Sequence, residues 1–355
     1  MIYKTIEELT TVVTGGTPST SKAEYWENGN IPWLQSGCCQ NCDVNQADKF
    51  ISQSGYDNSS TQVMPVNTVM IALTGATAGK VGYLNVEACG NQSITGIFPC
   101  EELNPRFLFY FLISQRRKIL VDCVGGAQAH ISQGYVKKIK VPVYSKSIQE
   151  RIVNIMNICS KNIKHYEMIL KEYDVLVKAR FIEMFGDPVL NERKFPTLSG
   201  ADFFKLSNGR AVPDEKRIET GIPAYGGNGI SWYTDEFLMA EDTIVVGRVG
   251  FQSGNVHYVI GPLWITDNAM YISQYDKDKF NLRFLCELMQ HVNFSRFQDA
   301  GDLKKITQKP FMTFKYILPS MDLQQKFVNF KIEVDKSRFD IKKSIIELER
   351  EVVYD

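Results

Sequence analysis

The feature that most constrains this chain is an internal repeat. Residues 71–83 align with residues 246–258 at an offset of 175 positions, and the two segments share a pair of turn glycines, a valine and a tyrosine. Further segments align at the same or a similar offset: 104–108 with 281–285, 131–133 with 306–308, and 148–153 with 323–328. Chance matches between common residues would not keep this order and spacing over half a chain. The sequence therefore predicts two copies of one folding unit.

Each copy contains the same succession of local patterns. Short β-branched and aromatic runs bounded by glycines predict strands, for example at residues 68–73, 81–86, 243–246 and 255–260. A short helix follows, at residues 106–121 in the first copy, and then a turn and a strand that ends at a proline. The predicted fold class is α+β, with two tandem-repeated globular domains at residues 1–145 and 191–319.

A long helix follows each predicted domain. Residues 146–185 contain no glycine or proline, with Pro142 before them and Gly186 after them, and residues 320–355 also lack both. Apolar residues recur at about seven-residue spacing in both segments, among them Ile152, Ile155, Tyr166 and Tyr173, and Val334, Ile341 and Leu348. This spacing favours an antiparallel coiled coil with an approximate internal two-fold axis, formed by the helical segments 146–190 and 320–355. The alternative is that each helix packs only on its own domain.

Motifs for catalysis are missing from the sequence. It has no nucleotide-binding glycine loop, no Asn-Pro-Pro-Phe/Tyr loop for base methylation, and no Ser/His/Asp or zinc-protease pattern. Cys39 and Cys42 resemble half of a zinc site, but a second pair of ligands is missing. The four histidines are scattered, which favours ordinary surface or core roles. We therefore expect a protein that is not an enzyme and that holds no metal or cofactor.

The order of several short motifs resembles a known family. Residues 15–19 (Gly-Gly-Thr-Pro-Ser), 30–34 (Asn-Ile-Pro-Trp-Leu), 75–82, 91–93 and 126–132, followed by Val141-Pro142 and a glutamine-bearing helix, look like the recognition unit of type I restriction-modification specificity subunits. Both halves carry the pattern, although the second has Ser207 to Pro213 in place of the Gly-Thr-Pro-Ser form. The resemblance implies two target-recognition domains that read a bipartite DNA site. It also implies that the helices, with their apolar positions given above, separate the domains and bind methyltransferase subunits.

Candidate DNA contacts follow from local charge and loop chemistry, because the formal net charge is zero. Basic clusters suit phosphates, and glycine-flanked loops can present side chains to base edges. The expected phosphate contacts are Lys137, Lys138, Lys304 and Lys305. The expected base contacts are Thr77, Lys80, Gln128 and His130 in the first domain, and Arg248, Gln252 and Asn255 in the second. A merely solvated basic face is the alternative for each lysine cluster.

The resemblance thus implies a DNA-specificity subunit whose partners are double-stranded DNA, two methyltransferase subunits and, in the full complex, restriction subunits. The competing hypothesis is a non-catalytic scaffold in which a coiled-coil spacer joins two protein-binding domains. We expect a cytoplasmic protein with no membrane partner, since no apolar run is long enough to span a bilayer and residues 1–9 do not form a secretion signal.

Overall fold

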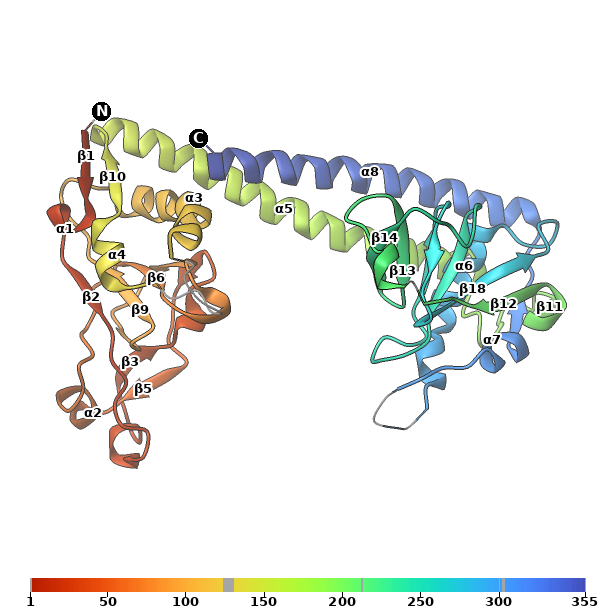
Figure 1. Cartoon of the computed structure of the whole chain (residues 1–355), viewed down its shortest axis with the longest axis horizontal. Coiled ribbons are helices and arrows are strands. Elements are labelled where there is room, and N and C mark those ends of the chain that lie inside the picture. Colours follow the sequence, from red (N-terminus) through yellow and green to blue (C-terminus); the bar gives the residue numbers. More distant parts are fainter. Residues whose placement is uncertain (1, 124–130, 212, 300, 302–303, 355) are drawn as a thin grey trace. The chain divides into compact units, whose positions relative to one another are not determined.

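The structure is a computed structural model that describes residues 2–123, 131–211, 213–299, 301 and 304–354. Its contacts divide the chain into two compact units (Figure 1). Unit 1 comprises residues 1–167 and 342–355, and unit 2 comprises residues 168–341. Each unit thus contains one of the two repeats together with parts of both long helices. No helix within the described ranges is long and apolar enough to cross a membrane.

Unit 1 contains three small sheets, of which the largest has the strand order β2-β9-β6-β7-β4. The other two have the orders β5-β3-β8 and β1-β10. Its strands are β1 (Ile2–Thr5), β2 (Val12–Thr14), β3 (Ile31–Leu34), β4 (Cys42–Val44), β5 (Lys49–Ile51), β6 (Val69–Ala72), β7 (Val81–Leu84), β8 (Cys89–Gly90), β9 (Ile94–Ile97) and β10 (Lys140–Val143). Its helices are α1 (Ile6–Leu9), α2 (Gln53–Asp57), α3 (Pro105–Cys123) and α4 (Gln133–Lys138).

Unit 2 repeats this arrangement. Its sheets have the orders β12-β18-β15-β16, β14-β13-β17 and β11-β19. Its strands are β11 (Thr197–Ser199), β12 (Phe204–Asn208), β13 (Ile222–Gly226), β14 (Gly229–Thr234), β15 (Thr243–Gly247), β16 (Val256–Val259), β17 (Trp264–Ile265), β18 (Ala269–Tyr275) and β19 (Lys315–Ile317). Its own helices are α6 (Leu282–Val292) and α7 (Lys309–Thr313).

The two topologies correspond sheet by sheet. In the small three-stranded sheets, the central strand pairs antiparallel with one neighbour and parallel with the other in both units. The larger sheets share four strands in equivalent order, and unit 1 adds β4 at one edge. The predicted duplication of one unit of mixed helices and strands is therefore confirmed.

Two long helices contribute to both units. They are α5 (Lys146–Phe185), which passes from unit 1 to unit 2 after residue 167, and α8 (Met321–Tyr354), which passes from unit 2 to unit 1 after residue 341. α5 spans the run without glycine and proline, and it ends at Phe185, before the end of the predicted helical segment 146–190. It ends where Gly186, at φ +72°, donates its N–H to the carbonyl of Ile182, a left-handed cap for which glycine has no steric penalty.

Within unit 2, parts of α5 and α8 pack together in opposite directions. The rings of Phe181 and Phe327 lie 5.4 Å apart, and Asp174 forms an ion pair with Arg338. Residue numbers rise along one helix as they fall along the other, so these parts are antiparallel. Both helices also pack on the core of unit 2, because Phe181, Phe185 and Phe327 are fully buried with Phe284 of α6.

A buried glutamine anchors the start of each long helix. In unit 1, Gln149 accepts a hydrogen bond from the N–H of Asn104 and donates to the carbonyls of Glu102 and Tyr144. In unit 2, Gln324 accepts from the N–H of Asn281 and donates to the carbonyls of Lys279 and Pro319. Both glutamines are 0% exposed. In each unit, two of these bonds therefore fix the long helix to the chain at the start of the short helix, and the third holds the residues just before the long helix.

Candidate DNA interface

The glycine-flanked turns that the sequence singled out have the same backbone structure in the two units. We call residues 74–80 the unit 1 turn and residues 249–255 the unit 2 turn. In the unit 1 turn, Gly79 N–H donates to the carbonyl of Ala72 and Lys80 N–H donates to the carbonyl of Thr77. The equivalent donors in the unit 2 turn bind the equivalent carbonyls. Four turn glycines have positive φ: Gly75 (+73°), Gly79 (+72°), Gly250 (+90°) and Gly254 (+90°).

A second segment of the chain lies against each turn. In unit 1, Ile131 donates its N–H to the carbonyl of Leu73 at 2.9 Å. In unit 2, Ile306 donates to the carbonyl of Arg248 at 3.0 Å, which is the same bond shifted by the repeat offset. Each turn is therefore supported on one side by its strand hairpin and on the other by the chain that leads into α4 or α7.

Unit 2 brings five of the expected DNA contacts together. Val249 and Lys305 form an antiparallel bridge, and Gly250 N–H donates to the carbonyl of Lys304 at 2.8 Å. Gln252, Asn255 and both lysines are exposed, whereas Arg248 is half-buried. A guanidinium N–H of Arg248 donates to the carbonyl of Asp267 at 3.3 Å. The result is a surface with three basic side chains and two amides on one fixed turn and its neighbour.

Unit 1 gathers fewer of its expected contacts. Thr77 and Lys80 lie on the unit 1 turn, where the Lys80 ammonium donates to the side-chain oxygen of Gln40 at 2.6 Å. Lys137 and Lys138 lie in the last turn of α4, and the next residue, Ile139, accepts a hydrogen bond from the N–H of Ile6. These two lysines therefore lie at the end of α4 that is near α1. Ile131, which bonds to the chain beside the unit 1 turn, lies before the opposite end of α4. Gln128 and His130 lie outside the described residues.

Sequence reasoning missed one residue of the unit 2 turn. Phe251 lies between Gly250 and Gln252 with 86% of its surface exposed, and the Lys304 ammonium is 5.5 Å from its ring centroid. Its counterpart in unit 1, at the repeat offset, is Ala76. The sequence signal that could have indicated it is an aromatic residue directly after a turn glycine, because a side chain on a hairpin turn is too far from the core to be buried there.

The environment of the cysteine pair that resembled half of a zinc site does not suit metal binding. Cys39 is buried, and its hydrogen bond with Cys38 together with its burial raises the pKa of its thiol. A raised pKa disfavours the thiolate that a metal requires. The described residues contain no group of three or more His, Cys, Asp or Glu side chains arranged to hold a metal ion.

The helix positions expected to bind partners differ in accessibility. Val334 is only 6% exposed, so its side chain belongs to the core of unit 2 and is not available to a partner. Ile152 and Tyr173 pack partly on the cores of their own units. Tyr166, Ile341 and Leu348 are half-buried, and Ile155 is 48% exposed. Among the side chains described up to residue 350, the most exposed apolar ones on these helices are Ile158 (61%), Met168 (57%), Val175 (67%) and Phe339 (69%).

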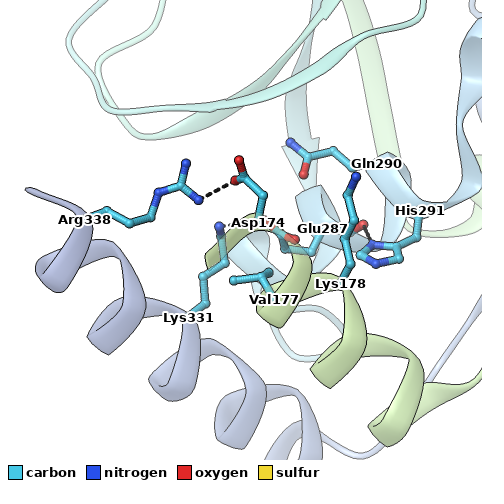
Figure 2. A pocket seen from close by; sticks show the side chains of 8 residues that line it. All are labelled: Asp174, Val177, Lys178, Glu287, Gln290, His291, Lys331 and Arg338. Carbon is cyan, nitrogen blue, oxygen red and sulfur yellow. Dashed lines mark hydrogen bonds and ion pairs between the residues drawn. The ribbon is translucent and has the colours of Figure 1, made fainter. Parts of the chain in front are cut away.

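A polar pocket of about 150 Å³ lies between α5, α6 and α8 of unit 2 (Figure 2). The Lys331 ammonium is 2.9 Å from a carboxylate oxygen of Glu287, whose side chain is only 7% exposed. Burial alone would lower the pKa of Lys331, but the carboxylates of Glu287 and Asp335 outweigh it and raise that pKa. Burial lowers the pKa of His291, which stacks on Phe181 with ring centroids 3.9 Å apart. These contacts tie the three helices together.

Comparison with known proteins identifies the family. Residues 2–172 and 194–350 both match the family model described as the type I restriction modification DNA specificity domain. The chain belongs to this DNA specificity family. The resemblance inferred from the sequence is therefore confirmed, and so is the role in sequence-specific DNA recognition that defines the family. The two matched segments correspond to the two repeats.

Curated specificity subunits and solved structures from type I restriction-modification systems resemble the chain. The Escherichia coli EcoR124I/EcoR124II specificity subunit is 30% identical over 160 residues, which are 44% of this chain and only 40% of that protein. The Escherichia coli EcoprrI specificity subunit is 24% identical over 87% of this chain and 81% of its own length. A crystal structure of the S subunit from M. genitalium has a TM-score of 0.59 at 18% identity, covering 99% of this chain and 93% of that one. A chain from a structural study of type I complex assembly has a TM-score of 0.64 at 12% identity and covers 99% of this chain and 95% of its own length. The chain thus shares the fold of these two solved structures.

Proposed function

We propose that the chain sets the DNA sequence on which a type I restriction-modification complex acts, and that each unit reads one half of a two-part target. The observation that carries the proposal is the duplicated glycine turn, held by equivalent backbone hydrogen bonds in both units. A protein with two copies of one recognition element suits a site with two half-sites. The chain itself is non-catalytic in this proposal, and its partners carry out the chemistry.

The side chains of the unit 2 turn support recognition of DNA. Arginine can bind guanine through two hydrogen bonds, and glutamine and asparagine suit adenine, which matches Arg248, Gln252 and Asn255. The exposed Lys304 and Lys305 are next to them and suit phosphates. Because the formal net charge is zero, such local placement of positive charge is what DNA binding by this chain requires.

The proposal includes an antiparallel coiled coil of α5 and α8 and an approximate internal two-fold axis. Support comes from unit 2, where contacts such as Asp174 with Arg338 run in antiparallel order. An internal two-fold axis would relate the equivalent anchors at Gln149 and Gln324. Such symmetry would present the two reading turns to DNA in inverted orientation.

Methylation mapping tests the DNA function. When the chain is expressed with its methyltransferase subunit, we expect adenine methylation at one split motif, and target binding that weakens steeply with salt.

The variant Arg248→Ala tests one half-site. Its affinity for the target should fall about tenfold or more, and its base preference should relax in one part of the motif, because a bidentate arginine contact is lost. The other part is the internal control. A continuous motif, or salt-independent binding as a protein scaffold predicts, would contradict the proposal.

We further propose that exposed apolar side chains of the long helices bind two methyltransferase subunits, and that restriction subunits join the full complex. In unit 2, Met168, Val175 and Ile182 of α5 recur every seventh residue and are 57%, 67% and 45% exposed. Residues seven apart lie on one face of a helix, so these side chains form an apolar stripe. In the absence of a partner the stripe is exposed to water, and exposed apolar surface of this kind marks a protein-binding site.

The variant Val175→Glu tests this apolar stripe. A carboxylate in the centre of a buried contact would stay desolvated and unpaired, so we expect affinity for the methyltransferase subunit to fall on the order of tenfold. The control is Asn329→Glu, which adds the same charge at an exposed position of α8 in the same unit. Titration of the purified chain with the methyltransferase subunit measures both. Equal affinities for the two variants would argue against the stripe.

A further inference from the structure

Phe251 is the most exposed large apolar side chain in the part of the chain that the structure describes, at 86%. It lies at the tip of the unit 2 turn and makes no contact with a core. Exposure of a phenylalanine ring costs free energy relative to burial. A large ring held in water beside basic side chains therefore needs an explanation other than folding.

The turn that carries Phe251 is fixed from several directions. Gly250 N–H donates to the carbonyl of Lys304 at 2.8 Å, and Ser253 N–H donates to the carbonyl of Gly250 at 3.0 Å. The Gln298 side chain donates to the carbonyls of both Phe251, at 3.3 Å, and Ser253. Because the backbone is already ordered, little conformational entropy would be lost when the ring meets a ligand.

The two faces of the ring differ. The Lys304 ammonium stands over the ring, 5.5 Å from its centroid, at a distance typical of a cation–π contact. The exposure of the ring leaves the other face open. Lys305 lies on the neighbouring segment, and Arg248 directly precedes the turn. One exposed apolar ring thus lies on a turn that has basic residues on it or next to it, which suits a ligand that combines phosphates with a small apolar group.

The major groove of DNA offers one such group, because the 5-methyl of thymine is the apolar feature among the base edges. Insertion between base pairs fits less well. It costs a few kcal/mol of unstacking for each step, and the Lys304 ammonium stands over one face of the ring. We propose that Phe251 packs its open face on the methyl group of a thymine in the half-site read by unit 2. This inference rests on the proposed DNA function.

Replacement of thymine by uracil tests the contact. The full chain, assembled with its methyltransferase subunit, is titrated with duplexes that carry the mapped target, and each thymine is replaced by uracil in turn. For the unchanged protein, one position should weaken binding about fourfold, the effect of one buried methyl group. Phe251→Ala should bind the thymine duplex at least as weakly as the unchanged protein binds the uracil duplex. It should no longer distinguish thymine from uracil at that position.

The control is Ile260→Ala, which removes another exposed apolar side chain (64%) just beyond the far end of β16. It should discriminate between thymine and uracil as the unchanged protein does. The inference is overturned if Phe251→Ala still discriminates between thymine and uracil, or if no thymine of the target is sensitive to replacement by uracil. In either case, specific binding of the target would leave the proposed function intact. A 2-aminopurine signal that reports base unstacking and depends on Phe251 also overturns it, in favour of insertion. If the unchanged complex binds no specific target, both proposals fail.

Discussion

Replacement of Gln324 by leucine is expected to lower the free energy of unfolding by about 3 kcal/mol, because buried polar groups lose their partners. The amide of Gln324 is 0% exposed and serves one backbone N–H and two backbone carbonyls. Leucine has a similar volume but no polar atom, so these three groups would be left without their hydrogen bonds. For a unit of this size, the loss corresponds to a fall of about 6 to 12 °C in the unfolding midpoint.

The neighbouring glutamine is a matched control for this prediction. Gln325→Leu changes the same residue type one position along α8, but Gln325 is exposed and forms hydrogen bonds with the side chains of Asn281 and Asn329 at the surface. Its effect should stay within about 0.5 kcal/mol. Thermal unfolding of the full chain compares the two variants, and hydrogen exchange at the Asn281 amide reports the broken bond directly. Equal stability of the two variants would mean that water replaces the buried glutamine amide.

The bounds of the long helices could be predicted from the sequence because their signals are local. A run without glycine or proline, followed by Gly186, marks α5, and the structure begins and ends it where the run does. The roles of the apolar residues could not be predicted in the same way. A heptad pattern does not distinguish packing on the domain from packing on another helix or on a partner. Val334 is accordingly in the core, whereas Ile155 is half exposed.

The repeat predicted the turns, but it did not predict their surroundings. Arg248 and Lys305 are far apart in the sequence and meet through the bridge between Val249 and Lys305. Lys137 and Lys138 form an equally basic cluster, yet α4 carries them toward α1. Charge clusters in a sequence carry no information about the direction in which the fold points them. The exposure of Phe251 has the same origin, because only the hairpin geometry keeps it out of a core.

The second large effect is expected at the ion pair between α6 and α8. Lys331→Met should lower the free energy of unfolding by about 3 to 5 kcal/mol, since it leaves a buried carboxylate without its partner. Glu287 has a side chain that is 7% exposed, and the Lys331 ammonium at 2.9 Å is its charged partner across the helix contact (Figure 2). Chemical denaturation of the full chain measures the loss. The control is Lys336→Met, which removes an exposed lysine from α8 and should cost less than about 1 kcal/mol.

Unit 1 indicates how the loss can be reversed. At the positions aligned with Glu287 and Lys331 it has Tyr110 and Met156, a neutral pair. Tyr110 is buried and donates its hydroxyl to Asn157 at 2.7 Å, and Met156 packs on the core. The same fold is therefore held together at this place without ions. The double variant Glu287→Leu, Lys331→Met should accordingly recover most of the stability lost by Lys331→Met alone, because no charge then stays buried and unpaired. If the double variant were as unstable as the single one, the cost would come from lost packing of the lysine stem instead of from the stranded carboxylate.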